Sequence, residues 1–279
     1  MAEKIITGSV ANWDASKRGP RNKFTLSALT LAIIFQLAPC LSGVWAGPPF
    51  VTDDPETVEY RHGEFYLTTE YSNDKDEFSG TAPHLEVNYG VWPNVQLHLI
   101  NRYSYIRPRG DSTKYGIGDT EIGVKYRFIQ ETDSLPQVGA FPQIELPTGD
   151  SSRGLGNGHT QVFLPIWLQK RWGPWQTYGG GGYWRNPGNG HKDYWLFGWQ
   201  GQRDLSKSLT VGAEIFHATP STEGGPHRTG FNVGAIINFS EEHHFIFSAG
   251  RDFHGDNLFS TYAAYLWTFG PSEKKKGKR

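Results

Sequence analysis

The chain has 279 residues, which is enough for one large domain or two modest ones. Hydrophobic residues make up 37% and charged residues 20%, both low for a globular protein, whereas 34 residues are glycine and 14% are aromatic. The formal net charge of −1 at pH 7 argues against nucleic acid as a partner. This composition favours an all-β architecture: a sandwich, a propeller or a membrane barrel.

The N-terminal residues 1–46 have the three-part organisation of a secretory signal peptide. A basic region precedes a largely apolar stretch that ends in small residues at Ala46. A single transmembrane anchor is the alternative, but Gln36 and Pro39 interrupt the stretch, and its length is marginal for a span. Processing as a lipoprotein at Cys40 is a further alternative, which Pro39 disfavours. Cys40 is the one cysteine of the chain, so we expect no disulfide in the mature protein.

From residue 63 onwards, apolar and polar residues alternate with a period of two. Such alternation predicts strands with two unlike faces. It is clearest in residues 116–128, where Ile122 and Val124 alternate with Glu121 and Lys125. In chain order, the predicted strands are residues 63–71, 81–90, 94–106, 116–128, 137–146, 159–170, 175–185, 193–202, 209–218, 229–239, 244–253 and 260–269. Pro142 and Pro165 lie inside two of these segments, where a proline indicates either a bulge or the absence of a strand.

The connections between the predicted strands add a second regularity. Long connections rich in Gly, Ser, Asp, Asn and Pro, such as residues 147–158, alternate with short ones, such as residues 90–94. This alternation is typical of an up-and-down barrel with one rim outside the cell and the other in the periplasm. An even number of strands places both ends of the barrel on the periplasmic side.

The two strand faces predict which solvent each one meets. Within lipid, every backbone N–H and C=O group must be paired inside the protein, and a closed sheet achieves this. Because a lysine or arginine facing lipid at the midplane would cost about 2–4 kcal/mol, the charged face must point inward. We therefore predict a transmembrane antiparallel up-and-down β-barrel of about twelve strands over residues 47–270, followed by a basic tail, residues 271–279. A soluble β-sandwich, with its apolar face buried against a second sheet, is the alternative.

Aromatic residues near the ends of the predicted strands fit interfacial girdles. Tyr103, Tyr194 and Trp267 are among them. In a sandwich, the same residues would belong to aromatic-rich loops.

The inward face supplies the candidate functional residues. The positions that we expect to line the lumen as a solute path are Glu86, His98, Arg102, Glu121, Lys125, Arg127, Glu145, Gln161 and Glu214. One interpretation is a polar path that sets solute selectivity. The other is a network of ion pairs that stiffens a narrow barrel without transport. A barrel of about twelve strands lies between filled eight-stranded barrels and open sixteen-stranded porins, so the alternation leaves both open.

Other motifs give weaker signals. The glycine run at residues 179–182 either leaves room for a ligand or an inward-folded segment, or serves only as a curvature device. The ten histidines show no spacing typical of zinc, so no metal and no cofactor are predicted. An outer-membrane hydrolase is the enzymatic alternative, because His217 shares the apolar face of its strand, although no GxSxG stretch exists.

Several segments resemble a known family. PPFVTDDPETVEYRHGEFYLTTEY, GIGDTEIGVKYRF, QIELPTGD and FNVGAIINF are similar to bacterial outer-membrane proteins of the family "putative MetA-pathway of phenol degradation", whose members are often called transporters. The resemblance covers roughly residues 48–269. It implies the outer membrane of a Gram-negative cell and passage of small molecules, aromatic or hydrophobic compounds among them.

Together these observations predict a non-enzymatic outer-membrane channel for small molecules. Its expected partners are outer-membrane lipid, the barrel-assembly machinery and a small-molecule solute. The alternatives are a barrel with a hydrolase or structural role, and a secreted β-sandwich that binds carbohydrate through its tryptophans.

Overall fold

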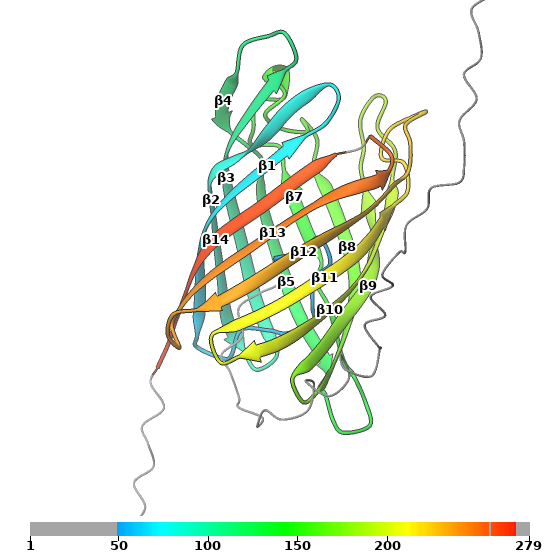
Figure 1. Cartoon of the computed structure of the whole chain (residues 1–279). Helices are drawn as coiled ribbons and strands as arrows, with labels where there is room; N and C mark the ends of the chain where they lie inside the picture. Colours follow the sequence, from blue (N-terminus) through cyan, green and yellow to red (C-terminus); the bar gives the residue numbers. More distant parts are fainter. Residues whose placement is uncertain (1–48, 257, 272–279) are drawn as a thin grey trace, which may run out of the picture. The chain divides into compact units, whose positions relative to one another are not determined.

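A computed structural model describes residues 49–256 and 258–271, which form one antiparallel sheet. The strands are β1 (Gly63–Asn73), β2 (Glu77–Trp92), β3 (Val95–Pro108), β4 (Lys114–Ile117), β5 (Thr120–Ile129), β6 (Gln137–Ala140), β7 (Gln143–Leu146), β8 (Gln161–Trp172), β9 (Trp175–Arg185), β10 (Tyr194–Ser206), β11 (Leu209–Ala218), β12 (Arg228–Asn238), β13 (His243–His254) and β14 (Phe259–Phe269), with a 3₁₀ turn, η1 (Ser151–Arg153), before β8. Figure 1 shows the tilted strands in chain order around the sheet. Within the described ranges, no helix has the length and apolar character of a membrane-spanning one.

The sheet closes on itself because β1 pairs with β14 along its whole length, from Gly63↔Phe269 to Asn73↔Phe259. Two strands are interrupted: β4 and β5 both pair with β3, and β6 and β7 both pair with β5 and β8. Counting each couple once gives twelve strand positions. The predicted fold class is confirmed, and the sandwich alternative is wrong.

One predicted strand is interrupted where we expected continuity. Residues 116–128 divide between β4 and β5, with Gly118 and Asp119 outside both strands. The reason is a long-range contact, because the Asp119 carboxylate accepts hydrogen bonds from the backbone N–H groups of Gly149 and Asn157 in the connection before β8. Asp119 therefore serves as an anchor for that connection.

The two faces of the wall differ as the alternation predicts. Large apolar side chains are exposed on the outer face, among them Leu85, Val87, Leu97, Leu99, Ile122, Val124, Leu164, Ile166, Ile215, Phe231 and Val233. Polar side chains at the intervening positions are buried, among them His98, Gln96, Glu121, Lys125, Gln169, Gln200, Glu214 and Asn232. An apolar outer belt around a polar interior is the organisation of a barrel in lipid.

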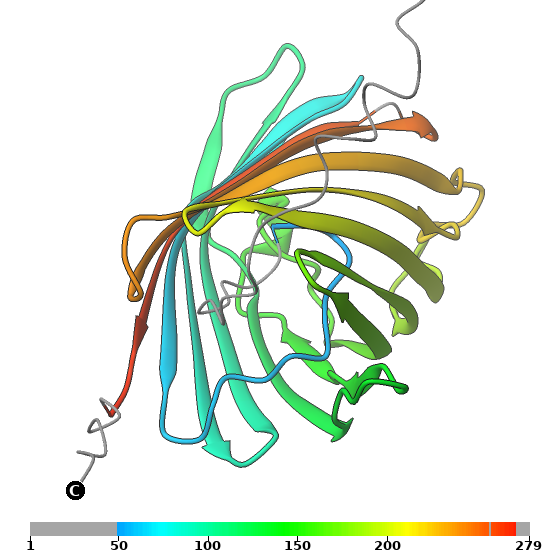
Figure 2. The same ribbon diagram turned by 60° about the horizontal axis from the view of Figure 1, so that its bottom comes forward.

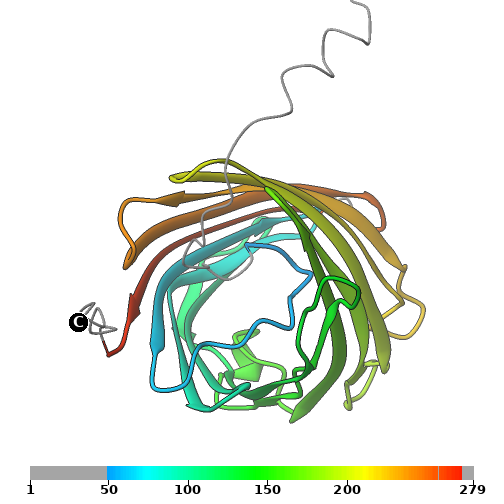
Figure 3. The ribbon, with the colours of Figure 1, turned by 90° about the horizontal axis from the view of Figure 1, so that it is seen from below.

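The described stretch that precedes β1 runs through the interior of the barrel. In Figures 2 and 3, the stretch that leads into β1, drawn in blue, crosses the interior of the ring of strands. Its two ends are fixed by hydrogen bonds, from the Ser248 hydroxyl to the Pro49 carbonyl and from the Val58 N–H to the Gln96 side chain, the latter at 2.8 Å. We call residues 49–59 the lumenal segment. The predicted barrel thus holds part of its own N-terminal region in its lumen.

Val124→Arg tests the assignment of the outer face to hydrocarbon. Val124 lies near the middle of β5, so we expect the free energy of unfolding in a bilayer to fall by about 2–4 kcal/mol. Phe128→Arg, on the same face beside the end of β5, should lower it by only about 0–1 kcal/mol. Urea titration in lipid vesicles, followed by tryptophan fluorescence, measures both values. Equal losses at the two positions would contradict the assignment.

Candidate functional site

The barrel has two unlike rims, which serve to locate the site. The long-loop rim carries the connections β1–β2, β3–β4, β7–β8, β9–β10, β11–β12 and β13–β14. The short-turn rim carries the connections β2–β3, β5–β6, β8–β9, β10–β11 and β12–β13, together with the start of β1 and the end of β14. All nine sequence-predicted residues are buried or half-buried, and each has a polar partner inside the barrel. They divide into a network towards the long-loop rim and a set of clamps on the lumenal segment. Their role in a solute path stays a prediction.

Five of the predicted residues form one continuous ion-pair network across β2, β3, β5 and β7. His98 lies at its centre, with Nδ1 3.5 Å from Glu86 Oε1 and Nε2 3.0 Å from Glu121 Oε1. Arg102 bridges the other side, with Nη2 2.7 Å from Glu121 Oε2 and Nη1 3.1 Å from Glu145 Oε1. Strand register brings the residues together, because Glu121 lies opposite Glu145 and beside the inward positions of β3. Opposite charges on adjacent inward positions offset each other where water is scarce.

The connection between β7 and β8 folds onto this network. The Asn157 side chain donates to Glu145 Oε2 at 3.1 Å and to Gln161 Oε1 at 2.7 Å. Asp119 accepts from the N–H of Gly149 at 2.9 Å and from the N–H of Asn157 at 2.6 Å. Gln161, the sixth predicted residue, therefore joins the network through a loop residue that alternation could not identify.

A cavity of about 360 Å³ lies above the network, between β1, β2, β3 and the folded connection. Its charged lining residues are Glu70, Glu77, Arg102, Asp119 and Glu145, and residues 154–157 close one side. Arg102 is thus shared between the cavity and the network beneath it.

Two predicted cations hold the lumenal segment. The Lys125 ammonium lies 3.0 Å from Asp53 Oδ1 and 3.6 Å from Asp54 Oδ1. The Arg127 guanidinium forms an ion pair with Glu56. Lys125 is buried, so its charge is stabilised by carboxylates that the sequence places about seventy residues earlier. The acidic run Asp53-Asp54-Pro55-Glu56 was the available signal for this contact.

Glu214 fixes the other part of the segment from the opposite wall. Its carboxylate accepts the backbone N–H groups of Val51 and Thr52, both at 2.8 Å, and a further hydrogen bond from the Asn232 side chain. Thr52 reaches the wall at Gly198, where a Cβ would lie 1.9 Å from the Thr52 Oγ1. A side chain at position 198 would therefore clash with that of Thr52.

The glycine run at residues 179–182 does not accommodate the lumenal segment, although room for an inward-folded segment was one use that we considered for it. A Cβ on Gly181 or Gly179 would lie 2.4 Å from the outward rings of Phe197 and Trp199, respectively, and one on Gly182 would lie 2.6 Å from the inward Phe163. The run makes room for aromatic rings on both faces of β9. The segment is accommodated at Gly198 instead.

Aromatic rings line the lumen along β8, β9 and β10. Trp184 stacks on Tyr194, with ring centres 5.9 Å apart, and on Phe163, with ring centres 4.7 Å apart. Phe163 also contacts Trp167 at 6.4 Å. We call these four residues the aromatic ladder. Tyr194, which we expected in an interfacial girdle, belongs to the aromatic ladder instead. Alternation alone would place Phe163 and Trp167 inward, because each lies an even number of residues from the inward Gln161.

The aromatic ladder ends at a group of unpaired polar atoms. Trp167 Nε1, Gln169 Oε1, Tyr178 Oη, Gln200 Oε1 and Thr52 Oγ1 are buried without a hydrogen-bond partner among the described residues. Register places Gln169, Tyr178 and Gln200 side by side on β8, β9 and β10. We call these five residues the polar step. Buried polar atoms without partners cost about 1–3 kcal/mol each, which favours water or a polar solute beside them.

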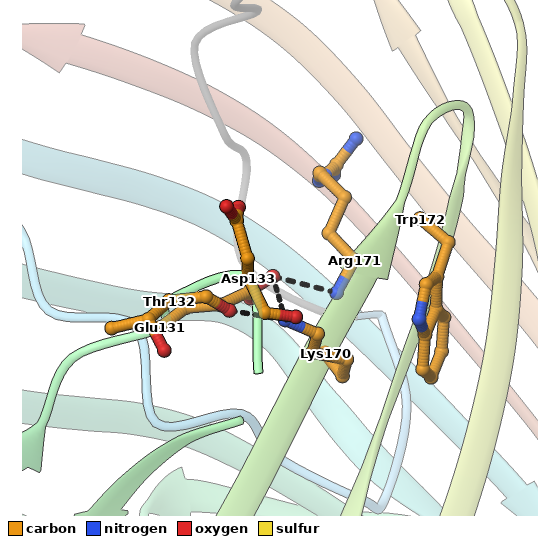
Figure 4. A pocket seen from close by; sticks show the side chains of 6 residues that line it. All are labelled: Glu131, Thr132, Asp133, Lys170, Arg171 and Trp172. Atoms are coloured by element: carbon orange, nitrogen blue, oxygen red, sulfur yellow. Dashed lines mark hydrogen bonds and ion pairs between the residues drawn. The ribbon is translucent and has the colours of Figure 1, made fainter. Parts of the chain in front are cut away.

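A second cavity, of about 500 Å³, lies at the short-turn rim (Figure 4). Its Lys170 ammonium forms hydrogen bonds with the carbonyl oxygens of Thr132 and Asp133 and an ion pair with Glu131 at 3.4 Å. Because the Lys170 charge already has its partners in the β5–β6 turn, the residues around this cavity hold that turn against β8 and offer little to a ligand.

A loop carboxylate fastens the long-loop rim between β9 and β10. Asp193 accepts hydrogen bonds from the Tyr183 hydroxyl, the Asn186 N–H and the Arg185 guanidinium, at 2.7, 2.7 and 2.6 Å. Together these hydrogen bonds lower the pKa of Asp193 to about 2. The one from Tyr183 has the largest effect, followed by those from Asn186 and Arg185. The carboxylate is therefore charged at physiological pH and can keep all three hydrogen bonds.

His217, on which the hydrolase alternative rests, lies beside a threonine. Its Nδ1 lies 2.8 Å from the Thr229 hydroxyl, and its ring lies 5.5 Å from that of His227. The hydroxyl beside His217 thus belongs to a threonine and not to the serine that the hydrolase alternative assumed. In residues 49–256 and 258–271, no group of three His, Cys, Asp or Glu side chains could hold a metal ion.

Lys125→Met tests the clamp on the lumenal segment. The substitution leaves Asp53 and Asp54 without their counter-ion, and losing one partner of a buried pair costs about 3–5 kcal/mol. We expect the segment to leave the lumen, so that a Val51→Cys reporter reacts faster with maleimide-polyethylene glycol in vesicles. Lys170→Met removes the same charge at the short-turn rim and should leave the rate unchanged. An unchanged rate in the Lys125 variant would show that the ion pair does not hold the segment.

Comparisons with known proteins place this architecture. The COG4313 outer membrane channel from Pseudomonas putida F1 has a TM-score of 0.65 at 16% identity, over 77% of this chain and 98% of that one. The translocator domain of autotransporter NalP from Neisseria meningitidis has a TM-score of 0.53 at 10% identity, over 75% of this chain and 90% of that one. The KdgM porin has a TM-score of 0.50 at 9% identity, over 73% and 99%. At these identities, the likeness concerns the fold.

Sequence comparison gives the family. No curated protein matches the chain. The sequence model of the family "Putative MetA-pathway of phenol degradation" matches residues 63–268, which is the wall of the barrel from β1 to β14. The chain therefore belongs to the "Putative MetA-pathway of phenol degradation" family.

Proposed function

We propose that the protein is an outer-membrane channel that passes small molecules along its lumen without covalent chemistry. The observation that carries the proposal is a continuous inner surface that begins at the cavity under the long-loop rim and leads to the aromatic ladder. The fold of the COG4313 outer membrane channel and the KdgM porin supports it, because both proteins are named for passage through a barrel.

Strand register connects the cavity to the aromatic ladder. Glu145, which lines the cavity, pairs with Gln161 across β7 and β8. Phe163 is the next inward residue along β8, and it pairs with Trp184, which in turn pairs with Tyr194. From Glu145 at the cavity, Phe163 is therefore one strand spacing, about 5 Å, across the sheet and two residues, about 7 Å, along β8.

The aromatic ladder and the polar step together indicate the class of solute. Stacked rings bind another ring by offset stacking, a contact worth about 0.5–1.5 kcal/mol. The polar step then offers two donors, Trp167 Nε1–H and the Tyr178 hydroxyl, and acceptors on Gln169 and Gln200. A small aromatic molecule with one polar substituent would satisfy both parts. The name of the family, which mentions phenol degradation, is in line with this class.

The lumenal segment narrows the half of the lumen nearer the short-turn rim. Its contacts reach Glu214 on β11, Lys125 and Arg127 on β5, and Gln96 on β3. A segment tied to several strands leaves only part of the cross-section to solutes. We infer that the lumenal segment sets the conductance of the channel. If the barrel had a purely structural role, the segment would have to close the lumen completely.

Release of the segment tests this account of the narrow half. The triple variant Lys125→Met, Arg127→Met, Glu214→Gln removes both cationic clamps and the acceptor of two backbone N–H groups. We expect its single-channel conductance in planar bilayers in KCl to exceed that of the wild type, which itself should conduct. Lys170→Met serves as the control and should conduct like the wild type. A wild-type barrel that is correctly folded but gives no current would defeat the channel.

Trp184→Ala tests the aromatic ladder. Phenylalanine and leucine carry the same charges and cross lipid poorly, so liposome swelling compares a ring with an aliphatic side chain. We expect the ratio of the phenylalanine rate to the leucine rate to fall about two- to tenfold, the equivalent of one lost stacking contact. Trp195→Ala, which removes an outward-facing tryptophan from β10, should leave the ratio unchanged. An unchanged ratio in the Trp184 variant would exclude the ladder from the path.

A further inference from the structure

Two amide side chains of the polar step use their nitrogen atoms and leave their oxygen atoms without partners. Gln169 Nε2 donates to Glu56 Oε2 at 3.4 Å, and Gln200 Nε2 donates to Gln202 Oε1 at 2.7 Å. Gln169 and Gln200 are 4% and 0% exposed, and both Oε1 atoms are buried without a hydrogen-bond partner among the described residues. An amide oxygen can only accept a hydrogen bond, so each of these two atoms requires a donor.

Two hydroxyl groups extend this set of acceptors. Tyr178 Oη and Thr52 Oγ1 are likewise buried without a partner within residues 49–256 and 258–271. Tyr178 lies between the two amides in the strand register, and Thr52 lies against Gly198, the inward position next to Gln200 on β10. A hydroxyl accepts as well as donates, so four oxygen atoms of the polar step can accept hydrogen bonds. The remaining atom of the polar step, Trp167 Nε1, can only donate.

The lumenal segment adds negative charge beside these oxygen atoms. Residues 53–56 follow Thr52 directly and carry three carboxylates, which form ion pairs with Lys125 and Arg127. Glu214 adds a fourth carboxylate, which is held by neutral N–H donors of the segment and of β12. Carboxylates therefore outnumber cations around the polar step. An excess of one sign of charge raises the local concentration of the opposite ion.

The way in has the same sign of charge. The cavity under the long-loop rim is lined by four carboxylates and one guanidinium, that of Arg102. Glu86 and Glu121 of the network beneath it bring the carboxylates to six, and His84 and His98 are the histidines paired with members of this set. Even with both imidazoles protonated, negative charge would exceed positive charge here. An aromatic cation would thus be drawn towards the aromatic ladder, and an aromatic anion would be repelled.

Trp167 belongs to both the aromatic ladder and the polar step, so the two surfaces are continuous. On β8 it is the inward residue next to Gln169, about 7 Å away along the strand. A ring bound on the aromatic ladder would therefore present its substituent to the oxygen atoms of the polar step. The face of an indole ring also attracts a cation directly.

We propose that the polar step is a binding site for the ammonium group of a small aromatic amine, whose ring lies on the aromatic ladder. The inference rests on the proposed function, because the amine reaches the site along the lumen. An ammonium group has N–H donors and no acceptor, so the unpaired oxygen atoms of Gln169, Gln200 and Tyr178 complement it. A carboxylate in the same place would meet acceptors and negative charge. The polar substituent of the solute is thereby assigned a positive charge.

Block of the potassium current tests the site. Wild-type protein in planar bilayers, in KCl at pH 7, is exposed in both chambers to benzylammonium, benzamide or benzoate, three small aromatic molecules with a positive, a zero and a negative charge. The double variant Gln169→Leu, Gln200→Leu removes two acceptor oxygen atoms without changing the charge of the lumen. Gln176→Leu is the matched control, because Gln176 is a buried residue of β9 whose side chain accepts from Arg171 outside the polar step. Heat-modifiable migration in gels verifies that each variant is folded.

We expect benzylammonium to reduce the wild-type current at a concentration at which benzamide and benzoate leave it unchanged. The double variant should raise the half-blocking concentration of benzylammonium about tenfold or more, because hydrogen bonds to a charged group are lost. Gln176→Leu should match the wild type.

Three results would overturn the ammonium site. One is equal block by benzamide or benzoate, and another is an unchanged half-blocking concentration in the folded double variant. The third is a wild-type channel that conducts potassium but is not blocked by benzylammonium, a result that needs no variant and leaves the channel intact. Absence of any potassium current through the folded wild type would instead count against the proposed function.

Discussion

Hydrocarbon cannot form hydrogen bonds, and this constraint governs the whole molecule. Every backbone N–H and C=O group of the wall must find its partner within the protein, which only a closed sheet provides for strands. Closure then gives each strand one face towards lipid and one towards the lumen, so the sequence must alternate with a period of two. Exposed Val124 and buried Lys125, neighbours on β5, illustrate the result. Pro142 and Pro165 are among the exceptions to this rule, because a proline has no N–H to donate to a neighbouring strand.

The same constraint concentrates charge inside the barrel, where each charge needs a partner. Towards the long-loop rim, the wall supplies its own partners, and His98, Glu121 and Arg102 satisfy one another. Nearer the short-turn rim, the wall presents Lys125 and Arg127, and their partners come from the lumenal segment. The segment is therefore part of the electrostatics of the wall. Between these regions, the aromatic ladder gives the lumen an apolar side that suits rings, so that one interior combines charged, aromatic and narrowed parts.

Much of this could be predicted from the sequence, because alternation is local. The strand parity of Glu86, His98 and Glu145 sufficed to place them inward, and the pattern of connections sufficed for the closed barrel. What alternation cannot provide is the partner of an inward residue, since pairing depends on register and on contacts across the lumen. Lys125 with Asp53, about seventy residues apart, is such a case. The break between β4 and β5 at Asp119 has the same origin, because the Asp119 carboxylate accepts a hydrogen bond from a distant loop. The aromatic ladder was accessible through the parity of Phe163, but a bulky aromatic residue at an inward position runs against the expectation of a polar lumen.

The covalent connection between the lumenal segment and the wall has a kinetic consequence. Only residues 60–62 separate the segment from β1, and the isolated bridge between Tyr60 and Gly90 holds this short tether against β2. A segment that detached from Lys125 and Glu214 could not diffuse away. Its return would be an intramolecular step with an effective concentration in about the millimolar range. Detachment would accordingly be brief and self-reversing. The channel would then fluctuate between two widths on its own, with no soluble factor required to restore the narrower one.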